Sequence, residues 1–221
     1  MRNIVESGEE MRFENEEIHF KNSLSIEGSV VYENCKIFCY EDGCEASIEL
    51  AEDGQLTFRG CEIVFCGAKE DDEYFINSDG SLEMEDCKVL NANYFAWISE
   101  SAKLDVGGCD FLNGVQNLFV TENLSEDSSI CGCKFLSTAL PDFIDTDDDT
   151  RFDPLLSDSD GDGGLAIADC TFEFDADTKR YATNCCPKHS IIEDCTFVND
   201  DGVNAACLWG YTTCLHCKFD T

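Results

Sequence analysis

A cysteine that recurs at a nearly constant interval constrains the fold of this chain more than any other feature. The recurring positions are separated by 22 to 26 residues, apart from one step of 37, and comprise Cys35, Cys61, Cys87, Cys109, Cys133, Cys170, Cys195 and Cys217. A period of about 20 to 30 residues is typical of solenoids, in which each repeat forms one coil. The spacing therefore predicts a stack of eight or more coils.

The residues around each cysteine predict two short β-strands that meet at a bend. In all eight repeats the positions three residues before and two residues after the cysteine are apolar, as in Tyr32 and Ile37 or Phe58 and Ile63. Apolar residues alternate with a period of two on either side, which is the pattern of half-buried strands. We expect these sixteen positions to point into the core.

Two corners and a third strand complete the predicted coil. The residue before the cysteine is Asn, Gly or Asp in seven of eight repeats, types that tolerate left-handed backbone angles. A second corner lies seven residues before the cysteine, where five repeats carry glycine: Gly28, Gly54, Gly80, Gly163 and Gly210. A looser apolar segment at residues 74–77, 94–98 and 118–120 supplies a third side.

The repeat resembles a known family at this point. The pattern D-G-x-L-x-hydrophobic-x-[NGD]-C-x-F-x-N is clearest from Asp79 to Asn91, and residues 194–199 repeat its second half. It is similar to the right-handed parallel β-helix repeat of the pectate-lyase-like superfamily over residues 23–221. The resemblance implies an all-β fold, a single-stranded right-handed parallel β-helix (solenoid) of about eight or nine coils, with one acidic loop insertion.

The predicted organisation has three parts. Residues 1–22 form an N-terminal cap or a degenerate first coil, residues 23–221 form the β-helix, and an acidic loop is inserted at about residues 138–162. In the degenerate coil the usual cysteine, phenylalanine and asparagine positions are assigned to Ile18, Phe20 and Asn22.

The cysteines predict a column of reduced thiols in the core. Equivalent residues of adjacent coils lie about 4.8 Å apart, whereas a disulfide needs Cβ atoms about 3.5 to 4.5 Å apart. Reduced thiols favour a reducing compartment, so we expect a cytoplasmic location, or an extracellular one if the chain is a fragment of a longer secreted protein. A zinc site is a weaker alternative, best placed at the off-register residues Cys185, Cys186 and His189.

The charge of the chain excludes several partners. Asp and Glu number 47 against 14 Lys and Arg, which gives a net charge of −33. Direct binding to nucleic acid and to anionic membrane surfaces depends on positive charge, so both are excluded. No stretch is long and apolar enough for a membrane span. We expect a basic protein surface or a glycan as partner, with end-to-end association or additional domains in a longer chain as further options.

The acidic insertion raises the question of calcium. Its end, at residues 158–163, matches a D-x-D-x-D-G loop. However, Asp162 and Gly163 also fit the glycine corner, and Asp169 fits the bend, so a solvated acidic loop is the alternative. The calcium hypothesis uses Asp145, Asp147, Asp149, Asp158 and Asp160.

The superfamily also includes polysaccharide lyases and hydrolases, and the resemblance implies where such a site would lie. The lyases use Arg or Lys beside calcium, and the repeat shows no basic column. The hydrolases use clustered aspartates, which here follow the strands of the sixth and seventh coils: Asp175, Asp177, Asp200 and Asp201. Carboxylates one or two coils apart would be about 5 to 10 Å from each other, a separation that suits glycosidase acids.

The residues leave three functions open. The Gly-His-Gly of related hydrolases is absent, and residues 199–202 also read as a plain turn. The leading hypothesis is a non-catalytic β-helix that presents a strongly acidic surface to a protein or glycan partner. The alternatives are a polysaccharide hydrolase or lyase and an acidic DNA mimic, and no cofactor beyond calcium is indicated.

Overall fold

The computed structural model describes residues 4–67, 74–92, 94–113, 118–121, 127–137, 156–158, 165–174, 191–199 and 213–220. In these stretches the chain forms three sheets, named A, B and C, of seven, nine and nine strands. The described part also contains one turn of 3-10 helix, Glu41–Gly43.

Among the described residues, sheets B and C take one strand from each of nine successive coils, and sheet A takes one from each of the first seven. Sheet A contains β1 (Ile4–Val5), β4 (Leu24–Ile26), β7 (Ile48–Leu50), β10 (Ile76–Ser78), β13 (Ala96–Ile98), β16 (Phe119–Thr121) and β19 (Leu156–Asp158). Sheet B contains β2 (Glu10–Glu14), β5 (Ser29–Glu33), β8 (Gln55–Arg59), β11 (Ser81–Glu85), β14 (Lys103–Gly107), β17 (Ser129–Cys131), β20 (Ala166–Ala168), β22 (Ile191–Glu193) and β24 (Thr213–Leu215). Sheet C contains β3 (Glu17–His19), β6 (Lys36–Cys39), β9 (Glu62–Phe65), β12 (Lys88–Leu90), β15 (Asp110–Leu112), β18 (Lys134–Ser137), β21 (Thr171–Phe174), β23 (Thr196–Asn199) and β25 (Lys218–Asp220).

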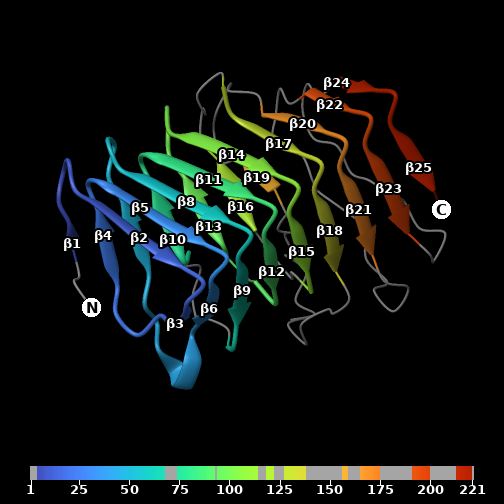
Figure 1. Ribbon diagram of the computed structural model, residues 1–221. Helices are drawn as coiled ribbons and strands as arrows, with labels where there is room; N and C mark the ends of the chain where they lie inside the picture. Colours follow the sequence, from blue (N-terminus) through green and yellow to red (C-terminus); the bar gives the residue numbers. More distant parts are fainter. Residues whose placement is uncertain are drawn as a thin grey trace, which may run out of the picture.

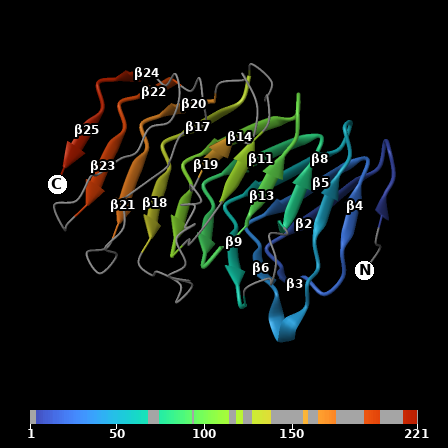
Figure 2. The same ribbon diagram turned by 180° about the vertical axis from the view of Figure 1, so that it is seen from behind.

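The topology is that of a parallel β-solenoid. In the first seven coils the chain runs through sheets A, B and C in turn before it starts the next coil, and neighbouring coils pair in parallel, as β5 does with β8 and β8 with β11. Figures 1 and 2 show the coils side by side, with the two ends of the chain at opposite ends of the stack. The predicted fold class is confirmed.

The predicted core positions point inward. Tyr32 pairs in register with Phe58, and Ile37 pairs with Ile63. Fourteen of the sixteen positions are buried, whereas Cys214 is half-buried and Phe219 is 48% exposed. These two exceptions lie on the last described coil, where described strands cover the core from one side only.

Five phenylalanines of sheet C form a continuous stack of rings. Neighbouring ring centroids lie 4.8 to 5.0 Å apart, with interplanar angles of 5° to 8°, in the order Phe111, Phe135, Phe172, Phe197 and Phe219. The spacing equals the distance between strands, because each ring comes from the same register position of a successive coil. The repeat thus builds its core from identical contacts.

The bend before each cysteine adopts the predicted left-handed conformation. The backbone angle φ lies between 52° and 65° at all eight positions: Asn34, Gly60, Asp86, Gly108, Gly132, Asp169, Asp194 and His216. Asn15 on the first coil has φ of 55° and extends the column. The bend connects sheets B and C and turns the cysteine side chain into the core.

The prediction for the first coil is wrong by two residues. Ile18 pairs with Ile37, which lies two residues after a cysteine, so Ile18 does not occupy the cysteine position. Glu16 lies there instead, since its carbonyl accepts the Lys36 amide at 2.8 Å. The assignments of Phe20 and Asn22 shift with it. Because side chains alternate with a period of two, a slip of two residues leaves the inside and outside pattern unchanged, and this coil has no cysteine to fix its register.

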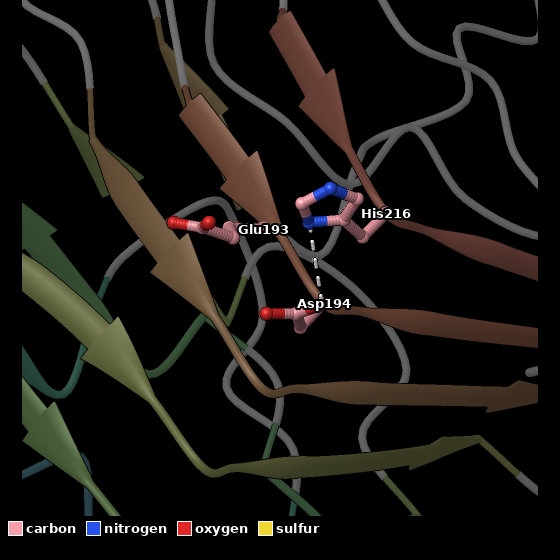
Figure 3. Close-up of side chains that lie close together, drawn as sticks. All are labelled: Glu193, Asp194 and His216. Atoms are coloured by element: carbon pink, nitrogen blue, oxygen red, sulfur yellow. Dashed lines mark ion pairs between the residues drawn. The ribbon is translucent and has the colours of Figure 1, made fainter.

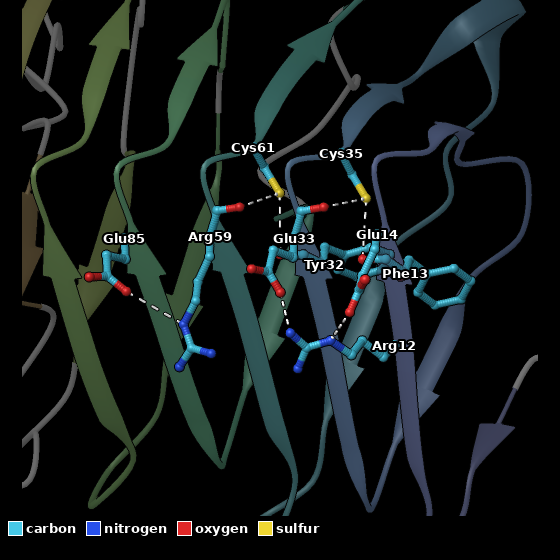
Figure 4. A network of polar contacts seen from close by, with 9 residues as sticks. All are labelled: Arg12, Phe13, Glu14, Tyr32, Glu33, Cys35, Arg59, Cys61 and Glu85. Atoms are coloured by element: carbon cyan, nitrogen blue, oxygen red, sulfur yellow. Dashed lines mark hydrogen bonds and ion pairs between the residues drawn. The ribbon is translucent and has the colours of Figure 1, made fainter.

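The thiols of the column donate hydrogen bonds to backbone carbonyls. The Cys61 thiol lies 3.4 Å from the Arg59 carbonyl of its own coil and 3.3 Å from the Tyr32 carbonyl of the preceding coil (Figure 4). Cys133, Cys170 and Cys195 make the same pair of contacts. The cysteines of the described part form no disulfides. Through these hydrogen bonds, the column thiols connect the bend of one coil to a strand of the preceding coil.

Thiol labelling should separate these buried cysteines from exposed ones. Burial keeps the reagent away from the column thiols Cys87 and Cys109, and at Cys39, outside the column, it also raises the pKa of the thiol because a thiolate there would lose its hydration. We expect iodoacetamide at mildly alkaline pH to modify the exposed Cys66 and Cys131 of the folded protein, and to modify Cys87 and Cys109 only after denaturation. Peptide mass spectrometry measures this. Equal labelling of Cys66 and Cys109 in the folded protein would contradict the buried column.

Candidate functional site

The A/B corner, where each coil turns from sheet A to sheet B, brings neighbouring coils unusually close. A Cβ atom built on Gly54 would lie 2.4 Å from the Ile26 carbonyl oxygen, and one built on Gly80 would lie 2.3 Å from the Ala51 and Gly54 carbonyl oxygens. Real Cβ contacts are longer than this, so the corner of these coils accepts only glycine. The Ser81 amide donates to the Gly54 carbonyl at 3.0 Å and holds the coils together there.

The next coil departs from this rule at one position. Ala102 stands where the earlier coils have glycine and is buried. The preceding residue, Ser101, has a φ of 65°, whereas Asp53 and Asp79 at the same position are not among the residues with positive φ. The backbone conformation at this corner therefore differs from that of the two preceding coils, in which the equivalent position is glycine.

A hollow of about 680 Å³ lies on the outer surface at this corner, and Gly54 and Gly80 are part of its lining. We call it the acidic hollow, because four carboxylates from three coils line it: Glu52, Asp53, Asp79 and Glu100. The other polar side chains of its lining are Gln55, Ser81, Ser99, Ser101 and Lys103. The carboxylates flank the corner glycines, so their spacing is set by the stacking of the coils.

The charge in the acidic hollow is largely uncompensated. Four carboxylates and one lysine give it a formal charge of −3. None of the four carboxylates forms an ion pair with a lysine or arginine of the described stretches. The lysine of the hollow, Lys103, instead places its Nζ atom 3.8 Å from Oδ2 of Asp105, which is not part of the lining. Such a hollow attracts cationic groups, because nearby carboxylates reinforce one another's field.

The outer face of sheet B is different, because there arginines neutralise neighbouring carboxylates. Arg12 pairs with both Glu14 and Glu33, and the Arg59 Nε atom lies 3.5 Å from Glu85 (Figure 4). Opposite charges on adjacent strands stabilise a sheet. Sheet B therefore offers a cationic partner less free negative charge than the A/B corner does.

A second acidic group lies at the bend between sheets B and C on the last two described coils. Ligand atoms of Glu193, Asp194 and His216 all lie within 4.8 Å of one another, and the three side chains are exposed (Figure 3). The His216 Nδ1 atom is 3.7 Å from an Asp194 carboxylate oxygen. Asp194 and His216 meet because each precedes a register cysteine on successive coils, so the spacing of the repeat contains the signal that brings them together.

Most residues of the sequence-based site hypotheses lie outside the described residues. This applies to the catalytic candidates Asp175, Asp177, Asp200 and Asp201, and to the calcium candidates Asp145, Asp147, Asp149 and Asp160. The zinc alternative at Cys185, Cys186 and His189 lies outside them as well. Asp158 is the last residue of β19 and pairs with Thr121 of β16, so its backbone belongs to sheet A. The catalytic, calcium and zinc hypotheses all remain predictions.

Comparison with known proteins adds little to the geometry. No family model matches the chain, and no curated protein matches it. A solved structure of QnrB1 after trypsin treatment, described as a plasmid-mediated fluoroquinolone resistance protein, aligns with 90% of this chain and 91% of its own at 12% identity and a TM-score of 0.27. A likeness this distant carries no functional argument. The protein is a parallel β-solenoid. Membership of the pectate-lyase-like superfamily remains a hypothesis.

The described part of this solenoid contains no helix long and apolar enough to cross a membrane.

Proposed function

We propose that this solenoid is a non-catalytic binding module that receives a basic protein surface at its acidic hollow. The observation that supports the proposal most directly is the set of four carboxylates from three coils, which surround an open hollow and form no ion pair with a described lysine or arginine. A lysine or arginine side chain of a partner would supply the missing charge. Complementary charge of this kind increases both the rate and the specificity of association.

The backbone of the corner favours such a role because it is rigid. Glu52, Asp53 and Asp79 lie beside glycines that are packed against the carbonyls of the preceding coil. The Asp79 amide itself donates to the Leu50 carbonyl at 2.8 Å. Carboxylates on a fixed backbone lose little conformational freedom when a partner binds, which preserves affinity.

The lining also argues for a cationic partner over a glycan. Among the residues that form the hollow there is no aromatic ring, whereas carboxylates and serine hydroxyls predominate. Ligand sites for small molecules usually combine apolar and aromatic walls with a few polar groups. The composition of this hollow suits the ammonium and guanidinium groups of a basic protein.

Binding of a labelled oligolysine peptide tests the proposal. We expect the variant Glu52→Gln/Asp53→Asn/Asp79→Asn/Glu100→Gln to bind about tenfold more weakly, or worse, because each exposed charge pair contributes about 0.2 to 1 kcal/mol. Fluorescence anisotropy at about 0.1 M salt measures the affinity. The difference between the proteins should shrink at about 1 M salt, where the Debye length falls to about 3 Å.

A variant with the same net charge serves as the control. Glu16→Gln/Asp42→Asn/Glu45→Gln/Asp86→Asn neutralises four exposed carboxylates that do not line the hollow. We expect it to retain most of the affinity, with a change of about two- to threefold from the weaker overall field. Equal losses in the two variants would show that net charge alone attracts the peptide and would refute the hollow as the site.

Duplex DNA provides a further readout for the DNA-mimic alternative. If the solenoid occupies a nucleic-acid-binding cleft, it should displace duplex DNA from the basic partner that it binds. The variant with the four neutralised carboxylates in the hollow should displace less DNA than the unmodified protein does.

A further inference from the structure

The outer face of sheet C differs from the rest of this acidic protein because it carries two ordered columns of side chains. The first, here called the charge column, alternates in sign along six coils and consists of Glu17, Lys36, Glu62, Lys88, Asp110 and Lys134. The second, here called the apolar column, is half-buried and consists of Phe38, Val64, Leu90, Leu112 and Leu136. Figure 1 shows the strands that carry them, β6, β9, β12, β15 and β18, side by side.

The charge column is neutral, although the chain carries a net charge of −33. Three carboxylates and three lysines balance over its six coils, so a second acidic molecule meets less repulsion on this face. Part of the alternation serves the chain itself: Lys36 Nζ lies 2.9 Å from Glu62 Oε1 and 5.2 Å from the Phe38 ring centroid. Such intramolecular pairs do not account for the apolar column beside them.

We propose that two copies of this chain pack sheet C against sheet C with their solenoid axes antiparallel. A two-fold axis in the interface, between β9 and β12, reverses the order of the coils and keeps each column opposite itself. Glu62 then faces Lys88 of the second copy, Lys36 faces Asp110, and Glu17 faces Lys134. All six charges meet an opposite charge, and each contact occurs twice across the two-fold axis, as an isologous interface requires.

The apolar column is self-complementary under the same operation. Val64 faces Leu90 of the second copy, and Phe38 faces Leu112. These half-buried side chains would complete their burial, and removal of apolar surface from water drives association. The apolar contacts supply attraction, while the charge column fixes the register.

The parallel arrangement is disfavoured by the same column. In a closed dimer with parallel axes, the two-fold axis runs along the solenoid. If it lies on the charge column, lysine faces lysine and glutamate faces glutamate, and if it lies between the two columns, the charges face the apolar column and lose their hydration without a partner. Like charges in contact oppose association. The sequence of signs therefore selects the antiparallel dimer.

The face is small, so the dimer is expected to be weak. Six coils at about 4.8 Å span about 24 Å, and a four-residue strand is about 13 Å long. The resulting patch is below the roughly 800 Å² per partner of a standard interface. The dimer should therefore form at tens to hundreds of micromolar protein rather than at nanomolar concentrations.

This inference does not depend on the proposed function. The A/B corner is the vertex of the coil opposite sheet C, so the acidic hollows of both copies stay accessible in the dimer. Failure of peptide binding and failure of dimerisation are separate results.

Sedimentation equilibrium over this concentration range tests the proposal. At about 0.15 M salt, where screening limits long-range repulsion, we expect the mass to rise from 24.6 kDa towards twice that value. Lys88→Glu should abolish the rise, because it puts glutamate opposite Glu62 of the second copy. The control Lys103→Glu makes the same charge change on sheet B and should leave dimerisation unchanged.

A charge swap separates the contacts between copies from those within a chain. Glu62→Lys/Lys88→Glu restores opposite charges across the proposed two-fold axis, yet it leaves lysine next to Lys36 and glutamate next to Asp110 within the chain. Recovery of the dimer in this double variant supports the proposal. A folded double variant, verified by circular dichroism, that stays monomeric would overturn it.

Zero-length crosslinking with a carbodiimide tests the register in the unmodified protein. Glu17 and Lys134 are five coils apart in one chain, about 24 Å, so a direct link between them can form only between antiparallel copies. We expect the peptide pair that contains Glu17 and Lys134 in the crosslinked dimer. The absence of any crosslinked dimer would overturn the proposal. Links between identical coils of two copies, identified by mass spectrometry, would overturn it as well.

Discussion

Phe135→Ala should lower the free energy of unfolding by about 3 to 5 kcal/mol, the usual cost of removing a fully buried phenylalanine. Phe135 is 0% exposed and stacks on Phe111 and Phe172 at centroid distances of 5.0 and 4.8 Å. Its neighbours are held by strands at a fixed spacing, so they cannot close the cavity. Urea denaturation followed by circular dichroism measures the change.

The same stack offers a matched control in Phe219→Ala. Phe219 makes one described stacking contact, with Phe197 at 5.0 Å, and is 48% exposed. Because about half of its side chain is already in water, we expect a loss of about 1 to 2 kcal/mol. A loss below about 1 kcal/mol for Phe135→Ala would show that this residue does not occupy the core.

Gly80→Val should destabilise the protein by about 3 kcal/mol or more, because the added side chain would collide with backbone atoms, which cannot move aside as a side chain can. The new Cβ atom would lie 2.3 Å from two carbonyl oxygens of the preceding coil. Relief requires the coils to move apart, which stretches the hydrogen bond from the Ser81 amide to the Gly54 carbonyl. The midpoint of urea denaturation measures the loss.

Gly107→Val is the control for the glycine corner. Gly107 lies at the end of β14, its φ is not positive, and a Cβ atom there meets nothing within 4 Å. Valine is also favoured in strands, so we expect a change of at most about 0.5 kcal/mol. If both glycine variants had the same stability, the close approach of the coils at Gly80 would be refuted.

The corner glycines connect the fold to the proposed function. Gly54 and Gly80 are required because the coils touch there, and both glycines line the acidic hollow beside Asp53 and Asp79. A substitution of either glycine would therefore disturb the stacking of the coils as well as the hollow. For this reason the binding test changes the carboxylates and leaves the glycines in place.

The register of the solenoid could be predicted because one cysteine in each repeat marks the same position. Phe135 lies two residues after a register cysteine, which predicts that it points inward, and Asp86 lies one residue before one, which predicts the left-handed bend. Both predictions are confirmed. The first coil lacks the cysteine, and there the prediction is wrong by two residues, with Glu16 in the cysteine position. A period of two cannot distinguish registers that differ by two.

The form of a single coil follows from local sequence, because the alternation of apolar residues, the bend before each cysteine and the glycine corner repeat along the chain. The contacts between side chains of different coils depend on how the coils are stacked. Glu52, Asp79 and Glu100 gather around one hollow, and Glu193 lies beside His216. Neighbours in each group are 20 residues or more apart in the sequence and meet because the strands of successive coils pair in parallel. The length of each coil sets that alignment, and the coils differ in length, so surface columns emerge only when the strands are paired in register.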